Sequence, residues 1–173
     1  MGIFHLFFGF SGRINRGKYW LTLVIWLLIW IVAIVALLLG GLAIFDRNLQ
    51  DGSLPDPEDF DAFWRMIRDY GVLSLIILLF LIVSWVSALA IGVKRLHDRD
   101  RSGWWIVLLY FGPMVLQAAQ QSTESGTLAS ILLGLGAFAV SIWALVELGF
   151  LRGTSGPNRF GADPLQREVA IAA

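Results

Sequence analysis

Residues 20–45 read WLTLVIWLLIWIVAIVALLLGGLAIF and contain no charged side chain. Thr22 is the only residue in this run that carries a polar side chain. An α-helix rises about 1.5 Å per residue, so roughly 20 apolar residues cross a hydrocarbon core of about 30 Å. A helix that is apolar on every side over this length is typical of a membrane span. The stretch therefore predicts a transmembrane helix.

Three more apolar runs follow along the chain. Residues 71–93 contain no charge, and residues 128–151 carry one carboxylate, Glu147, near their end. Residues 104–119 form a weaker candidate, because 16 residues reach only about 24 Å. This run also contains Gly112-Pro113, which is expected to kink or break a helix.

The short run 104–119 either crosses a locally thinned bilayer or enters the membrane and returns on the same side. We favour a crossing, because the distribution of charge is then consistent. The sequence thus predicts an all-α polytopic membrane protein with four transmembrane helices, of which the third is short and interrupted at Gly-Pro. All 173 residues form one membrane domain in this interpretation.

Basic residues mark the side on which each connection lies. Ten of the thirteen fall before the first run, after the second and after the fourth: Arg13, Arg16, Lys18, Lys94, Arg95, Arg99, Arg101, Arg152, Arg159 and Arg167. The connection 46–70 has three arginines against seven acidic residues, and the connection 117–127 has no basic residue. The positive-inside rule therefore places the N-terminus and the tail, residues 152–173, in the cytoplasm.

The composition excludes several classes of protein and site. Hydrophobic residues make up 57% of the chain and charged residues 15%, and the mean hydropathy is +0.73. The formal net charge is zero, so no basic excess indicates a nucleic-acid partner. The absence of cysteine excludes disulfides and thiolate metal sites.

The acidic connection 46–70 contains a helical pattern. Phe60, Phe63, Trp64 and Ile67 recur at helical spacing after an acidic N-terminal signal at 56–59. We expect a short amphipathic helix, lying either on the outer membrane surface or packed over the helix bundle.

Small residues recur at every fourth position in two of the predicted spans. They are Ser84, Ala88 and Gly92 in one span, and Gly126, Ser130 and Gly134 at the start of another. Such seams let helix backbones approach closely in lipid. The sequence leaves open whether the seams meet each other or a second copy of the chain, so a homo-oligomer is one possible state.

Three polar motifs lie at the predicted cytoplasmic ends of the spans. They occupy residues 10–20, 94–105 and 153–164. Because all three are expected on one side of the membrane, they could form a single polar surface at the inner mouth of the bundle.

The motifs also carry a family resemblance. They contain Gly12-Arg13-Ile14-Asn15-Arg16, then Arg95-Leu96-His97-Asp98, then Gly156-Pro157-Asn158-Arg159-Phe160-Gly161-Ala162-Asp163-Pro164. This ordered set resembles the domain-of-unknown-function 805 family of bacterial inner-membrane proteins, over nearly the whole chain. The resemblance implies a multi-pass protein of the bacterial inner membrane and implies no activity.

Ten side chains of the motifs form the candidate polar cluster: Arg13, Asn15, Arg16, Arg95, His97, Asp98, Arg101, Asn158, Arg159 and Asp163. In one interpretation they form a salt-bridge and capping network, in which Arg95 or Arg101 pairs with a nearby aspartate. In the other they bind anions such as lipid headgroups, to which each basic residue near the inner leaflet contributes about 1 kcal/mol.

No set of catalytic residues can be assembled from the sequence. His97 and Asp98 are adjacent, so on one helix they point about 100° apart and cannot work as an oriented pair. One histidine with one or two acids also makes a poor metal site, and we expect no metal and no cofactor. The catalytic hypothesis that stays open is a membrane enzyme acting on a lipid-linked substrate through these two residues.

Glu147 is an ionisable residue inside a predicted span and is therefore a candidate for function. It could serve a small transporter or channel, or could simply pair with Arg152 at the inner interface. We prefer a non-enzymatic scaffold or binding module. Its expected partners are the lipid bilayer and, on the cytoplasmic side, anionic headgroups or a protein.

Overall fold

A computed structural model describes residues 2–50 and 60–166 of the chain. The secondary structure of the described residues consists of helices joined by loops, with no strand. The elements, in order, are α1 (Ile3–Phe8), α2 (Arg16–Gln50), α3 (Phe60–Asp98), α4 (Trp105–Gln121), α5 (Leu128–Leu145) and a π-helical turn, η1 (Val146–Phe150). The helix α1 was not expected from the sequence. The chain divides into two compact units, Val24–Trp85 and the remainder, and each is described separately.

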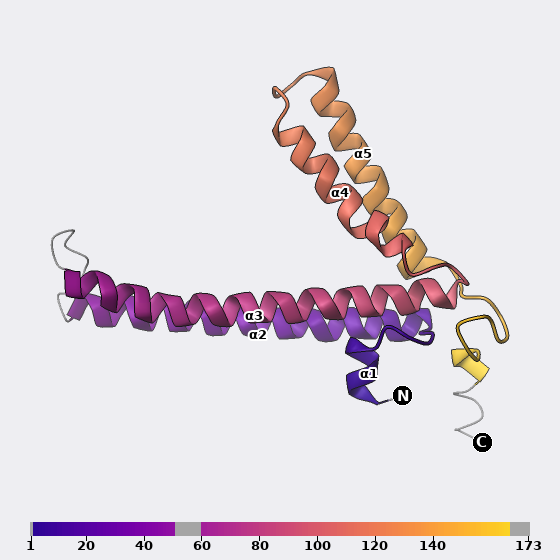
Figure 1. Cartoon of the computed structure of the whole chain (residues 1–173), viewed down its shortest axis with the longest axis horizontal. Coiled ribbons are helices and arrows are strands. Elements are labelled where there is room, and N and C mark those ends of the chain that lie inside the picture. Colours follow the sequence, from indigo (N-terminus) through magenta and orange to yellow (C-terminus); the bar gives the residue numbers. More distant parts are fainter. Residues whose placement is uncertain (1, 51–59, 167–173) are drawn as a thin grey trace. The chain divides into compact units, whose positions relative to one another are not determined.

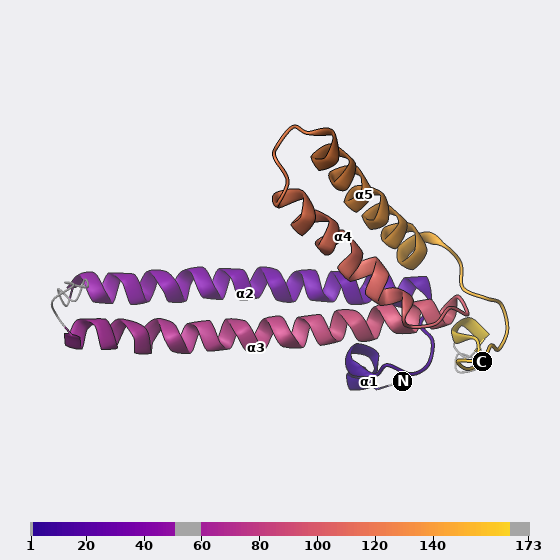
Figure 2. The ribbon, with the colours of Figure 1, turned by 45° about the horizontal axis from the view of Figure 1, so that its top comes forward.

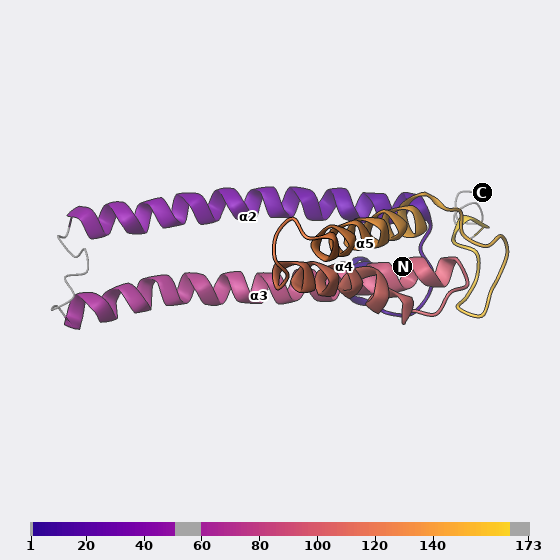
Figure 3. The ribbon, with the colours of Figure 1, turned by 90° about the horizontal axis from the view of Figure 1, so that it is seen from above.

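The unit Val24–Trp85 contains most of α2 and of α3, which run side by side (Figures 2 and 3). Phe80 of α3 meets Trp26 and Trp30 of α2 edge-on, with ring centroids 6.2 and 4.8 Å apart. Most of the large apolar side chains remain exposed, and Leu38 and Leu42 reach 62% and 64%. Such surfaces are stable in lipid and not in water.

Three helical segments are long and apolar enough to cross a membrane: Arg16–Arg47, Tyr70–Asp98 and Leu128–Phe150. They coincide with three of the predicted spans. The helix α4 has 17 residues and a length of about 25 Å, slightly less than the hydrocarbon core.

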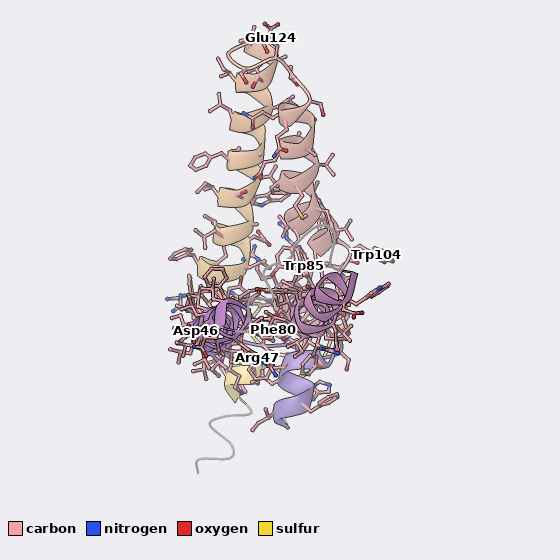
Figure 4. The ribbon with its side chains drawn as sticks, turned by 90° about the vertical axis from the view of Figure 1, so that its left-hand side faces the viewer. Asp46, Arg47, Phe80, Trp85, Trp104 and Glu124 are labelled. Atoms are coloured by element: carbon pink, nitrogen blue, oxygen red, sulfur yellow. The ribbon has the colours of Figure 1, made fainter. Side chains whose placement is uncertain are left out.

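In the second unit, α4 and α5 form an antiparallel hairpin (Figure 1). Glu124 lies at the tip of the hairpin and Trp104 at its base (Figure 4). The small-residue seam of α5 packs within this hairpin, since Ser130 and Ala137 are buried and a Cβ on Gly134 would lie 2.8 Å from the Gln120 side chain. The seam thus serves the contact between α4 and α5.

The seam of α3 faces α4 in the same way. A Cβ on Gly92 would collide with Ile106, and Tyr110 donates a long hydrogen bond of 3.5 Å to the Ala88 carbonyl. Both seams therefore contact α4, and these contacts do not join the two seams to each other.

The predicted break of the helix at Gly112-Pro113 is wrong. The helix α4 continues through Pro113, which is buried. Proline lacks one backbone donor, but helices in membranes tolerate this loss where neighbouring helices pack around the site. The helix α5 does pack here, since a Cβ on Gly112 would make an ordinary contact of 3.6 Å with Val140 of α5.

The connection 46–70 also differs from its prediction. Residues 46–50 end α2, and residues 60–70 form the first turns of α3, so the predicted helical residues 60–67 belong to α3 and are not a separate helix. The helix continues past Gly71, because one glycine in a long helix costs only about 1 kcal/mol. The predicted N-terminal signal at 56–59 lies outside the described residues.

We expect Gly92→Val to lower the free energy of unfolding by about 1–3 kcal/mol, because the added side chain overpacks the contact with Ile106. Thermal unfolding of the purified protein in detergent measures the effect. Gly41→Val is the matched control, since a Cβ at Gly41 meets nothing within 4 Å. Equal losses in the two variants would contradict the close α3–α4 contact.

Candidate functional site

Several helix ends meet within the second unit. They are the start of α2, the end of α3, the end of η1 and the segment 152–166. The last four carbonyls of a helix have no partner inside the helix and need other donors. The donors at this site are mainly side chains of the three polar motifs, so the motifs do come together as the sequence suggested.

Asp98, at the last position of α3, lies between two buried arginines. Its Oδ1 accepts hydrogen bonds from Nε and Nη2 of Arg13 at 3.2 and 3.1 Å, and its Oδ2 accepts one from Nη1 of Arg95 at 2.5 Å. Asp98 is 3% exposed, and the two guanidinium groups are equally buried. Arg13, Arg95 and Asp98 are called the Asp98 triad below.

Arg13 joins the triad to the C-terminal segment. Its Nη1 donates to the Gly156 carbonyl at 2.7 Å, and its Nη2 donates to the Thr154 carbonyl at 2.7 Å. Thr154 in turn donates its backbone N–H to the carbonyl of Asp98 at 2.8 Å. Gly153 passes so close to Asp98 that a Cβ there would collide with the carboxylate. The segment after η1 is therefore bound to the end of α3 at several points.

Arg95 caps the end of η1. Its Nε donates to the carbonyl of Leu148 at 2.7 Å, and its Nη2 donates to that of Leu151. The indole of Trp20, in α2, satisfies the Gly149 carbonyl at 3.0 Å. A cation at the negative end of a helix is also favoured by the helix dipole. Arg95 thus connects α3, η1 and the carboxylate of Asp98.

Lys94 caps α1 in the same way as Arg95 caps η1. It was not among the residues of the candidate cluster predicted from the sequence. The side chain is buried, and its Nζ donates to the carbonyls of His5 and Leu6 at 2.7 and 2.5 Å. Its position directly after the apolar run 71–93, as the first residue of the motif 94–105, is a signal that could have identified it. Its partners are backbone atoms, which residue identities do not reveal.

His97 and Asn158 fasten the tail on another side of α3. Asn158 donates to the His97 carbonyl at 2.9 Å, and the ring of Phe160 stacks on the imidazole with centroids 3.8 Å apart. The Nδ1 of His97 lies 3.2 Å from the carbonyl of Gly12, which can only accept, so this nitrogen carries the proton. These contacts of His97 involve neither of the two arginines that bind Asp98.

The end of α3 is shaped by Asp100, which adopts a positive φ of 57°. The backbone N–H groups of Asp100 and Arg101 bond back to the carbonyls of His97 and Leu96, the arrangement of a Schellman motif. Asp100 also pairs with Arg159 at 3.1 Å on the surface, where both side chains are about half exposed.

Glu147 is 2% exposed and lies in η1. Its Oε1 is 2.7 Å from Nε of Arg99 and 3.1 Å from Nε of Arg101. The sequence suggested Arg152 as its partner. The turn at Asp100 instead directs the two other arginines toward this carboxylate.

A cavity of about 500 Å³ lies beside the triad. Its lining includes Arg16 and Arg152, together with Asp98, Asp163 and the polar residues Asn15, Thr154 and Ser155. Asn15 caps α2, because its Oδ1 accepts the N–H of Lys18 at 2.8 Å. Among the residues that the structure describes, neither Arg16 nor Arg152 has a carboxylate partner.

Asp163 is held by the backbone of its own segment. Its carboxylate accepts the N–H of Gly156 at 2.9 Å and that of Leu165 at 3.0 Å. Hydrogen bonds from these two amides favour the charged form and hold the pKa of Asp163 below its ordinary value. A lowered pKa stabilises the fold at neutral pH, and this contribution is lost as the pH falls through the lowered value.

The structure thus brings the ten predicted residues to one region, but in different roles. Arg13, Arg95 and Asp98 form the buried triad, and Arg101 and Arg159 belong to separate ion pairs. His97, Asn158 and Asp163 organise the tail, whereas Asn15 and Arg16 line the cavity. In the described part of the chain, no three His, Asp or Glu side chains are placed to hold a metal ion.

The profile of the family described as "Protein of unknown function (DUF805)" matches residues 7–162 of the chain. The chain belongs to this family. The matched stretch includes the Asp98 triad, Glu147 and nearly all of the cavity lining. No solved structure is significantly similar to this DUF805 chain.

Three relatives come from Escherichia coli (strain K12). The uncharacterized protein YiiR is 30% identical over 164 residues, which cover 90% of the chain and 86% of YiiR. The inner membrane proteins YhaI and YhaH are 28% and 27% identical, each over 90% of the chain and 86% or 87% of the relative. With its apolar helices, this DUF805 chain is a multi-pass protein of the bacterial inner membrane.

We expect Asp98→Asn to lower the free energy of unfolding by about 3–5 kcal/mol, because it leaves two buried guanidinium groups without a counter-charge. Chemical or thermal unfolding in detergent measures the loss. Asp100→Asn is the control, since it removes an exposed ion pair worth less than about 1 kcal/mol and keeps a residue type that tolerates positive φ. A small effect at Asp98 would show that the triad is not essential for stability.

Proposed function

We propose that this DUF805 protein is a non-enzymatic membrane binding module. In this proposal it has four transmembrane helices with both termini in the cytoplasm, and it binds the phosphate group of a lipid at the cavity beside the Asp98 triad. The observation that carries the proposal is the pair of arginines, Arg16 and Arg152, which line one cavity without a carboxylate partner among the described residues.

The contacts at the helix ends support four crossings. Arg95 and Arg99, at the end of α3, bind Leu148 and Glu147 of η1, so the end of α3 and the end of η1 lie on the same side of the membrane. The chain between them includes α5, which is long enough to span. A chain that leaves one side and returns to it crosses an even number of times, so α4 supplies the other crossing.

The length of α4 is compatible with this role. It is one continuous helix, whereas a re-entrant segment needs a turn inside the membrane. Its shortfall of about 5 Å can be met by local thinning of the bilayer at modest cost. The basic residues around the meeting point favour the cytoplasmic side.

The buried arginines Arg13 and Arg95 are poor candidates for binding a ligand, whereas the arginines that line the cavity are better ones. Arg13 already donates through Nε, Nη1 and Nη2, and so does Arg95. Arg16 and Arg152 are exposed. A guanidinium group is well suited to a phosphate, because its N–H groups match two phosphate oxygens at once.

The geometry favours this role over the two alternatives from the sequence. His97 and Asp98 face different partners, so they do not form an acid–base pair. Glu147 is neutralised by two arginines, and a proton carrier needs a carboxylate that can readily change its charge.

Single cysteines introduced into this cysteine-free chain test the number of crossings. Ser102→Cys and Ser155→Cys should be protected from a membrane-impermeant thiol reagent in intact cells, and Ser125→Cys should react at once. All three should react after permeabilisation. If Ser155→Cys reacted in intact cells while Ser125→Cys did not, α4 would not span and the four-helix proposal would be wrong.

The double variant Arg16→Gln/Arg152→Gln tests phosphate binding. We expect it to retain at least about tenfold less phospholipid after delipidation and relipidation, since two guanidinium contacts are lost. Native mass spectrometry of the protein counts the retained lipids. Arg47→Gln, at the opposite end of α2, is the matched control, and equal retention by all forms would remove the support for the cavity as a binding site.

A further inference from the structure

The cavity contains a negative group as well as its two arginines. Asp163 contributes to the lining and is 8% exposed. The backbone N–H groups of Gly156, Leu165 and Gln166 bond to its carboxylate, and an ionised carboxylate offers about four acceptor positions, so some capacity to accept remains. Because its pKa is lowered, the group is charged at neutral pH.

Asp98 is the other carboxylate of the lining, and its oxygens are less available to a ligand than those of Asp163. Both oxygens of Asp98 are bound by Arg13 and Arg95. Arg16 and Arg152 are the exposed guanidinium groups of the lining. The carboxylate of Asp163 is hydrogen-bonded to neutral amides, although the charge of Arg13 also acts on it.

This pattern disfavours a ligand that carries only negative charge. An anionic headgroup would gain from the arginines and be repelled by Asp163, whereas a group with a phosphate and an ammonium would satisfy both ends of the cavity. An ammonium offers three donors, which suits a carboxylate with unused lone pairs. The volume of about 500 Å³ lies within the range of ordinary small-ligand sites.

We propose that the cavity selects a zwitterionic phospholipid whose headgroup carries a phosphate and a primary ammonium. Arg16 and Arg152 bind the phosphate, and Asp163 binds the ammonium. This inference rests on the proposed function and adds the identity of the headgroup to it. Asp163 is then a residue that determines specificity, and the arginines determine affinity.

The test compares two lipids in nanodiscs that hold the full chain. One set contains phosphatidylethanolamine and the other phosphatidylglycerol, each diluted into phosphatidylcholine, and native mass spectrometry measures the lipid retained. We expect the wild-type protein to prefer phosphatidylethanolamine by roughly fivefold, the size of one partly exposed ion pair. Asp163→Asn should abolish this preference and keep the binding of phosphatidylglycerol.

If Asp163→Asn still binds phosphatidylglycerol, its binding site is intact. The melting temperature of the variant checks the fold independently. Asp100→Asn is the matched control, since this carboxylate lies near the tail but does not line the cavity. It should leave the preference unchanged.

Two outcomes overturn the inference alone: a wild-type protein that binds both lipids equally, or a preference that survives Asp163→Asn. Free phosphoethanolamine that binds as tightly as the whole lipid would also overturn it, because the ligand would then be soluble. If instead Arg16→Gln/Arg152→Gln binds both lipids like the wild type, the proposed function itself has failed.

Discussion

A single carboxylate, that of Asp98, joins the helix ends and the segment 152–166 in the unit that contains the three polar motifs. It is buried between Arg13 and Arg95, and each arginine uses its remaining donors on backbone carbonyls of other segments. A buried arginine without a counter-charge is costly, and Asp98 is the carboxylate that both of these arginines bind. The positions of the tail, of η1 and of the segment before α2 all depend on this one group.

The same region shows how a membrane protein can satisfy its helix ends. Inside the bilayer each backbone group bonds within its helix, but the last carbonyls at the interface need other donors. Here Lys94 serves α1, Arg95 serves η1, and Thr154 and Asn158 serve α3. The basic residues on which the predicted orientation rests therefore also cap helices. Arg16 and Arg152 are not used in this way and lie at the cavity.

The sequence predicted the features that depend on composition over long stretches. Three of the predicted spans coincide with helices that are long and apolar enough to cross a membrane, because an uncharged run such as 20–45 needs no information about its neighbours. The meeting of the motifs was also predictable, since Arg13, Asp98 and Asn158 were all expected on one side. The sequence did not predict the features that depend on the positions of backbone atoms. Lys94 binds carbonyls, the partner of Glu147 was set by the turn at Asp100, and α4 passes through Pro113 because α5 packs beside it.

The bond between Arg13 and the Gly156 carbonyl joins residues 143 positions apart. Because the chain is synthesised from its N-terminus, Arg13 and α2 are made well before α5 and the segment that contains Gly156. The bond between Arg13 and Gly156 can therefore form only after all of the described helices have been made. Assembly of this region thus has a fixed order, in which the pair of Arg13 and Asp98 can form before the bond to Gly156.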